Sequence, residues 1–303
     1  MAFIKRIGFF LAMNFAIMVV INIIISAFDL QPFMHQSGIN YSHLMIFCLL
    51  WGMIGSLFSL FTSKFMAKKF MGVKIIDKTS TQYAELVRTV HQFAKKAKLP
   101  KMPEVGIYES PDVNAFATGP TRSNSLVAVS TGLLQKMDKD EVEGVLAHEV
   151  AHIANGDMVT STILRGVMNA FVMFLAHIII FFIDQATRDE NGRGGLGGFM
   201  RFFVYNFLHF VLGIGAAIVS SYHSRAREFK ADEGGARLAG KEKMTKALQK
   251  LASQYERLSP QKNTNQQAFQ AMQISSKNGL MKLLSTHPPL NKRIEALQKL
   301  RVL

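Results

Sequence analysis

The stretch Leu146-Ala147-His148-Glu149-Val150-Ala151-His152 places two histidines four residues apart, with a glutamate directly after the first. On a helix, residues i and i+4 share a face, so both imidazoles can bind one Zn²⁺ while Glu149 points at the open coordination position of the metal. This arrangement is typical of hydrolases that activate a water molecule. Because the pattern is short, the surrounding sequence has to decide whether it carries that chemistry.

The residues around the two histidines predict a helix of ordinary length. Asp138 and Glu141 form the pattern of a capping box, and Asn155-Gly156 is a typical C-terminal stop. Apolar residues recur between these ends at helical spacing: Val142, Val145, Leu146 and Ile153. His148, Glu149 and His152 are ionisable residues on this helix, and a purely structural helix would seldom bury such groups without partners.

Four uncharged apolar runs, 7–28, 44–61, 166–183 and 202–222, are each long enough to cross a bilayer core of about 30 Å. We therefore expect an integral membrane protein with four transmembrane helices. The first run follows Lys5 and Arg6 and exceeds the usual core of a signal peptide, which favours an uncleaved anchor over a cleaved signal. The third and fourth runs contain Asn and His residues, so buried or interfacial helices are the alternative for that pair.

The basic residues predict the orientation in the membrane. No Lys or Arg lies in 29–42, whereas Lys64, Lys68, Lys69 and Lys74 follow the second run. The positive-inside rule then places the N-terminus and the chain after residue 61 in the cytoplasm, with the 184–201 connection outside. Attraction to anionic lipid headgroups explains the net charge of +14 without a nucleic-acid partner. A disulfide framework or a thiolate metal site is excluded, because Cys48 is the only cysteine.

The soluble parts predict one α+β domain that is built from two blocks. We expect segments 1–63 and 163–222 to be two pairs of transmembrane helices, and segments 64–162 and 223–303 to form the cytoplasmic domain. The predicted elements of the first block are a helix over 83–98, a strand over 105–108, and a hairpin of 113–118 with 126–130 that turns at Gly119-Pro120. The second block is expected to be helical, with breaks near Gly240, Ser259-Pro260, Asn278-Gly279 and Pro288-Pro289.

A third metal ligand is expected shortly after the fourth apolar run. Glu228 and Asp232 are four residues apart on a predicted helix, so one carboxylate can bind metal while the other accepts the N–H of a ligand histidine. The alternative is a solvated charged face with ion pairs to Arg225 and Arg227. Two predicted spans separate this segment from His148, which leaves both on the same side of the membrane.

The whole chain resembles the HtpX-type membrane metalloproteases, a family related to the CAAX prenyl endopeptidases. The motifs that carry the resemblance are the N-terminal helical pair, Asn114-Ala115-Phe116-Ala117-Thr118-Gly119, the stretch from Ala147 to Asp157, the segment from Ser224 to Asp232, and Ser285-Thr286-His287-Pro288-Pro289-Leu290.

The resemblance implies four transmembrane helices and a mostly helical α+β fold, with a cytoplasmic, gluzincin-like zinc protease domain that contains a small sheet. His148, His152 and Glu228 would bind one zinc ion per chain, and Glu149 would be the general base. Asp232 would contact a ligand histidine, most simply His148. Asn114 and Ala115 would belong to an edge strand that pairs with the substrate, and His287 would either stabilise the oxyanion or form a structural corner with the following prolines.

The expected function is zinc-dependent endopeptidase activity in the bacterial cytoplasmic membrane, with the active site on the cytoplasmic side. The expected substrates are cytoplasmic regions of misfolded or damaged membrane proteins under stress. Two alternatives stay open: a membrane scaffold or chaperone that keeps the zinc fold without catalysis, and a protease specialised for prenylated C-terminal peptides. The sequence leaves the oligomeric state open.

Overall fold

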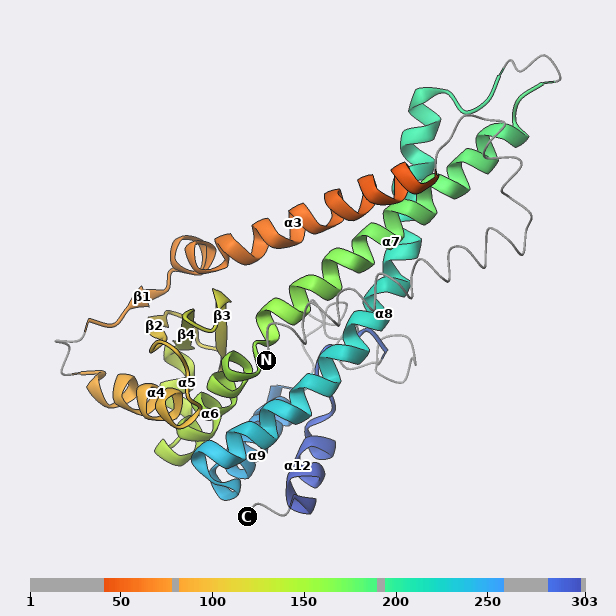
Figure 1. Cartoon of the computed structure of the whole chain (residues 1–303). Helices are drawn as coiled ribbons and strands as arrows, with labels where there is room; N and C mark the ends of the chain where they lie inside the picture. Colours follow the sequence, from red (N-terminus) through yellow and green to blue (C-terminus); the bar gives the residue numbers. More distant parts are fainter. Residues whose placement is uncertain (1–40, 78–81, 190–193, 259–282, 301–303) are drawn as a thin grey trace. The chain divides into compact units, whose positions relative to one another are not determined.

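The structure is a computed structural model that describes residues 41–77, 82–189, 194–258 and 283–300 (Figure 1). The chain divides into two compact units. The first contains Met1–Ser59 and Thr160–Ser220, and the second contains Leu60–Val159 and Ser221–Leu303. Both units are therefore assembled from segments that lie far apart in the sequence.

Three long helices contribute to the first unit: α3 (Tyr41–Phe70) up to Ser59, α7 (Asp157–Ala186) from Thr160, and α8 (Gly198–Ala239) up to Ser220. Each is long and apolar enough to cross a membrane, and they contain the second, third and fourth apolar runs. The first run, 7–28, lies outside the described residues. The described part of the chain therefore contains three of the four expected transmembrane helices.

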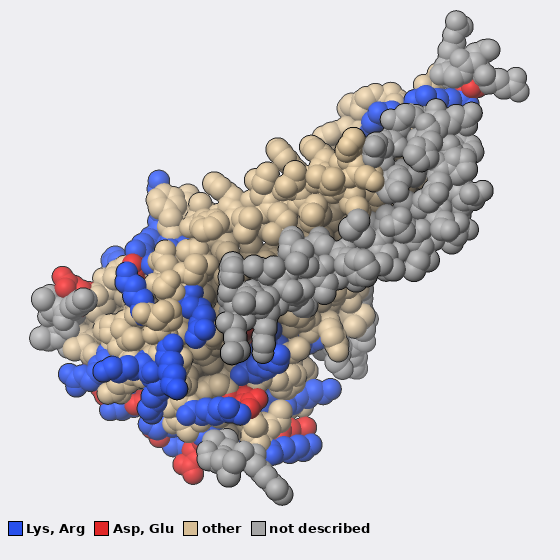
Figure 2. Space-filling model, viewed as in Figure 1, with Lys and Arg blue, Asp and Glu red and all other residues tan. Residues whose placement is uncertain are grey.

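Helices α3 and α7 pack closely because small residues lie where they cross. A Cβ atom on Gly52 of α3 would lie only 2.7 Å from the backbone nitrogen of Ala170 on α7. Cys48 is fully buried against Phe174 and Ile178 in the same unit. Figure 2 shows that the described surface of α3 is largely free of charge, and large exposed side chains such as Trp51 cover it. An apolar outer surface on closely packed helices is what a lipid environment favours.

The second unit contains a four-stranded mixed sheet in the order β1-β2-β4-β3. The strands are β1 (Lys74–Ile75), β2 (Glu104–Tyr108), β3 (Ala115–Thr121) and β4 (Asn124–Ser130). Strand β2 is antiparallel to β1 and parallel to β4, and β3 is antiparallel to β4. Strand β3 is therefore at the end of the sheet, where its outer edge is not paired with another described strand.

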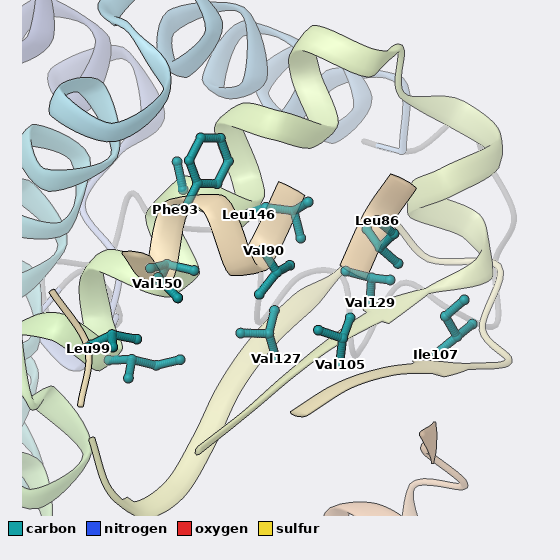
Figure 3. Packing of buried hydrophobic residues seen from close by; sticks show 13 residues of the cluster. Leu86, Val90, Phe93, Leu99, Val105, Ile107, Val127, Val129, Leu146 and Val150 are labelled. Atoms are coloured by element: carbon teal, nitrogen blue, oxygen red, sulfur yellow. The ribbon is translucent and has the colours of Figure 1, made fainter. Parts of the chain in front are cut away.

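Helices α4 (Ala84–Lys96) and α6 (Lys139–Asn155) cover one face of the sheet. Figure 3 shows how Val90 and Phe93 of α4 and Leu146 and Val150 of α6 pack over Val127 on β4. Alternate residues of a strand point to opposite faces, and the opposite face of this sheet is covered around Ala67 and Val73. The helix that bears the two histidines therefore packs on a sheet that has buried side chains on both faces.

The predicted hairpin is present, but its turn is three residues later than expected. The strands are joined through Arg122-Ser123, and Gly119-Pro120 lies inside β3, at an irregularity in the register between Thr118 and Thr121. Gly119 has a φ of 135°, and a Cβ atom there would lie 2.2 Å from the carbonyl oxygen of Asn124. Irregular positions of an edge strand often contain glycine and tolerate proline, so the same two residues that favour a turn can lie at such a position.

The predicted ends of the α6 helix are confirmed. The side chain of Asp138 accepts a hydrogen bond from the backbone of Glu141, the Glu141 side chain accepts one from the backbone of Asp138, and Gly156 ends the helix in the left-handed conformation. Strand β1 and the short helix α5 (Thr131–Lys136) were not predicted.

The described residues of the C-terminal part, 223–258 and 283–300, are mostly helical, as predicted. Helix α8 ends before Gly240, α9 (Lys241–Leu258) follows, and α12 (Leu290–Lys299) begins after Pro288-Pro289. The breaks predicted near residues 259 and 278 lie outside the described residues. Helix α9 packs on α6, where a Cβ atom on Gly144 would lie 2.5 Å from the carbonyl oxygen of Lys243, and α12 packs on α9.

Candidate metal centre

Helix α6 brings the imidazoles of His148 and His152 together. Their Nε2 atoms are 3.1 Å apart, and the rings meet edge to face. This follows from the spacing of four residues, which puts both side chains on one face of the helix a single turn apart. His148 is buried and His152 is partly buried.

Glu228 of α8 contacts both histidines. Its Oε1 atom lies 3.3 Å from His152 Nε2, and its Oε2 atom lies 3.6 Å from His148 Nε2. Glycine favours the close approach of α8 to α6, because a Cβ atom on Gly234 would lie 2.7 Å from the Cβ atom of Ala151, and one on Gly235 would lie 3.2 Å from the backbone nitrogen of His148. Glu228 itself is buried, so it does not belong to a solvated face, which was the alternative interpretation of its segment.

The three side chains fit a divalent metal ion of the size of zinc. Zn²⁺ binds imidazole nitrogen at about 2.0–2.1 Å and carboxylate oxygen at about 2.0–2.2 Å, so two ligand atoms of a tetrahedral site are about 3.3 Å apart. The two Nε2 atoms are 3.1 Å apart, and Glu228 Oε1 lies 3.3 Å from His152 Nε2, so both distances are close to this spacing. Within the described part of the chain, His148, His152 and Glu228 form the group of side chains that can hold a metal ion.

Each histidine has a carboxylate at its second ring nitrogen. His148 Nδ1 lies 3.0 Å from Asp232 Oδ1, and His152 Nδ1 donates a hydrogen bond of 2.7 Å to Asp157 Oδ2. A carboxylate at Nδ1 holds the proton there and leaves Nε2 to bind the metal. The sequence predicted the contact between Asp232 and a ligand histidine. It did not predict that of Asp157, which lies directly after the glycine that ends α6.

Glu149 lies beside the two histidines and is only partly exposed. Burial raises the pKa of its carboxyl group, while the neighbouring His148 and His152 lower it; the net pKa lies above its usual value. The backbone N–H of Ala117 on β3 donates a hydrogen bond to this carboxylate. Glu149 therefore lies between the histidine cluster and the outer strand of the sheet.

The predicted substrate-pairing residues lie on this strand or directly before it. The backbone of Asn114 is engaged with Ser130: its carbonyl accepts from the Ser130 N–H, and its N–H donates to Ser130 Oγ. Along an antiparallel strand, the backbone N–H and C=O groups of successive residues point alternately toward the neighbouring strand and away from it. Because those of Asn114 point toward β4, those of Ala115 and Ala117 point away from β4. The hydrogen bond from Ala117 to Glu149 agrees with this alternation.

The C-terminal segment adds two cationic or ionisable side chains to the cluster. His287 Nδ1 lies 2.9 Å from Glu228 Oε2, and the side chain of His287 is 67% exposed. Arg293 of α12 is buried and contacts both Glu228 and Asp232. The sequence singled out His287 through its motif, whereas Arg293 was not predicted because no local pattern marks it.

We expect zinc binding to release protons, and the affinity to rise with pH. In the metal-free protein, burial lowers the pKa of His152, but Asp157 and Glu228 outweigh this effect and raise the pKa to about 10. His152 is then protonated at pH 7, and the metal must displace this proton. Affinity should therefore increase as the pH rises toward 10. Calorimetric titration in two buffers with different heats of ionisation measures the protons released, and a result of zero would contradict this view of the site.

Comparison with known proteins shows what the chain is similar to. The model of peptidase family M48 matches residues 80–301. A Protease HtpX homolog from Methylacidiphilum infernorum is 46% identical over 300 residues, which covers 98% of this chain and 99% of that protein. Protease HtpX from Shewanella frigidimarina is also 46% identical, with 97% and 99% covered. The crystal structure of S. mikatae Ste24p has a TM-score of 0.58 and 18% identity, and covers 95% of this chain and 66% of that one, which shows a shared fold.

Proposed function

The chain belongs to peptidase family M48 and is a membrane metalloprotease, and from this premise we propose that it is a zinc-dependent endopeptidase of the bacterial cytoplasmic membrane. Its proposed substrates are the cytoplasmic regions of misfolded or damaged membrane proteins. The observation that carries the proposal is the convergence of His148, His152 and Glu228, with the carboxyl group of Glu149 beside them.

The resemblance inferred from the sequence motifs is confirmed by relatives that match over nearly the full length. In the proposed reaction, zinc, when bound, supplies a Lewis acid that lowers the pKa of water and polarises the scissile carbonyl. Glu149 accepts the proton of the attacking water and later passes it to the leaving amine. Its raised pKa suits both roles, because the group must be deprotonated at the start and protonated midway.

The substrate is proposed to bind as an added strand along β3. The outward backbone groups of Ala115 can pair with an extended peptide, and the same strand contacts Glu149 through Ala117. A peptide in this position would have its backbone next to the general base. The Asn114 side chain would contact the peptide at the beginning of the strand, where its backbone is held by Ser130.

His287 is proposed to donate a hydrogen bond to the oxyanion that forms on the scissile carbonyl. Two observations support this role: its Nδ1 atom lies 2.9 Å from Glu228, and most of its side chain is exposed. The alternative role, a structural corner, is compatible with the position of Pro288-Pro289 directly before α12. Both roles can be held by one residue, because the corner is made by the backbone and the hydrogen bond by the ring.

The proposed cytoplasmic location follows from charge. Lys64, Lys68 and Lys69 lie at the end of α3, whereas the sequence before α3 has no basic residue between 29 and 42. The positive-inside rule favours the cytoplasm for the lysine-rich end of such a helix. A protease anchored in this way would meet the cytoplasmic loops of other membrane proteins.

The proposal is tested with the purified full-length chain in lipid nanodiscs. The substrate is one membrane protein in its native form and in a destabilised form, and a prenylated C-terminal peptide is offered separately. We expect zinc-dependent cleavage within cytoplasmic loops, faster for the destabilised form. Preference for the prenylated peptide would favour the specialised protease, and no cleavage of any substrate would favour the scaffold.

A further inference from the structure

Arg293 joins the two carboxylates that α8 contributes to the metal centre. Its Nε and Nη2 atoms donate hydrogen bonds of 2.8 and 2.6 Å to the two oxygens of Asp232, and its Nη1 atom lies 3.1 Å from Glu228 Oε2. The guanidinium is buried, with 6% of the residue exposed. A cation that is buried between two carboxylates and contacts them in three places has a fixed position.

The two oxygens of Glu228 have different neighbours. Oε2 lies 3.1 Å from Arg293, 2.9 Å from His287 and 3.6 Å from His148 Nε2. Oε1 lies 3.3 Å from His152 Nε2, on the side of the imidazole pair. Each oxygen thus lies near one imidazole, but Oε2 is also within ion-pair distance of Arg293 and His287, which draw this oxygen toward the C-terminal segment.

This difference matters because a carboxylate can bind a metal ion through one oxygen or through both. Three protein ligand atoms leave a fourth position for water, which is the pattern of catalytic zinc sites. A second oxygen from the same carboxylate would compete for that position. The contacts of Oε2 with Arg293 and His287 disfavour binding of this oxygen to the metal.

We propose that Arg293 is a positioning residue that keeps Glu228 bound to the metal through a single oxygen, so that the position for water stays open. The inference rests on the proposed zinc-dependent function and deepens it. Arginine is required because one planar fork contacts both Asp232 and Glu228, which the single ammonium group of lysine cannot do. It follows that α12 is part of the metal centre, through Arg293, which lies 61 residues beyond Asp232.

The test uses cobalt(II) in place of zinc in the full-length protein, because the visible spectrum of cobalt reports its coordination geometry. We expect the intense spectrum of a four-coordinate ion in the unaltered protein. In Arg293→Lys, cobalt should still bind, with the weaker spectrum of a higher coordination number. kcat/KM should fall about 10- to 100-fold, as is usual when a residue that supports a metal ligand is changed. Arg237→Lys is the matched control, since Arg237 pairs with Glu233 in an exposed ion pair on the same helix as Glu228.

An Arg293→Lys spectrum identical to that of the unaltered protein would overturn the inference. So would a five- or six-coordinate spectrum in the unaltered protein, a result that needs no variant and holds even if Arg293→Lys fails to fold. Failure of the unaltered protein to bind cobalt or to cleave any peptide would instead contradict the proposed function. The two failures are therefore distinguishable.

Discussion

Replacing Glu149 by glutamine should lower kcat/KM by at least about 10²- to 10⁴-fold, the usual contribution of a general base, while one zinc ion per chain stays bound. Glutamine has the same shape and can still accept the hydrogen bond from the Ala117 N–H. It cannot take up a proton from water. Catalysis should therefore be lost without loss of the histidine and glutamate ligands, which are on other residues.

The measurement is peptide cleavage together with zinc content in the same preparation. Glu143→Gln is the matched control, because Glu143 lies on the same helix and pairs with Lys243 away from the cluster. The control should keep the activity of the unaltered protein. If Glu149→Gln cleaves as fast as the unaltered chain, the assignment of the general base is wrong.

Replacing Glu228 by alanine should remove the metal ion as well as the activity. Glu228 supplies the one carboxylate of the cluster, and its oxygens lie within 3.6 Å of both histidines. Without Glu228 the zinc ion keeps only two of its three protein ligands, so the zinc content should fall well below one per chain after dialysis. Activity should then be undetectable and should not return when zinc is added.

Glu233→Ala is the control for this experiment. Glu233 is on the same helix, five residues further on, but it forms an exposed pair with Arg237. The unaltered chain and Glu233→Ala should both lose activity with a chelator and regain it with zinc. Full zinc content and activity in Glu228→Ala would mean that another residue is the third ligand.

The sequence predicted the elements whose signals are local. The ends of α6 follow from the pair Asp138 and Glu141 at the start and from Gly156 at the end, and each end is made by contacts within four residues. The relation between His148 and His152 follows from helical spacing alone. The second, third and fourth apolar runs likewise lie in long helices, because length and the lack of charge are properties of the run itself.

The parts that the sequence did not predict depend on distant packing or on ambiguous residues. Gly119-Pro120 favours a turn by composition, and only the register with β4 shows that it lies inside β3, at an irregularity in the pairing. Asp157 reaches His152 because α7 begins directly after Gly156. Arg293 reaches Asp232 because α12 packs on α9, and neither contact has a signature in the surrounding residues.

The most direct test of the metal centre is the zinc K-edge X-ray absorption spectrum of the zinc-loaded Glu149→Gln protein, which cannot cleave itself. The account predicts one zinc ion with nitrogen and oxygen ligands at about 2.0–2.2 Å, two of them imidazoles, and a change in this shell when Glu228 is also replaced by alanine. An unchanged shell in the double variant, or a fourth protein ligand in place of water, would contradict it.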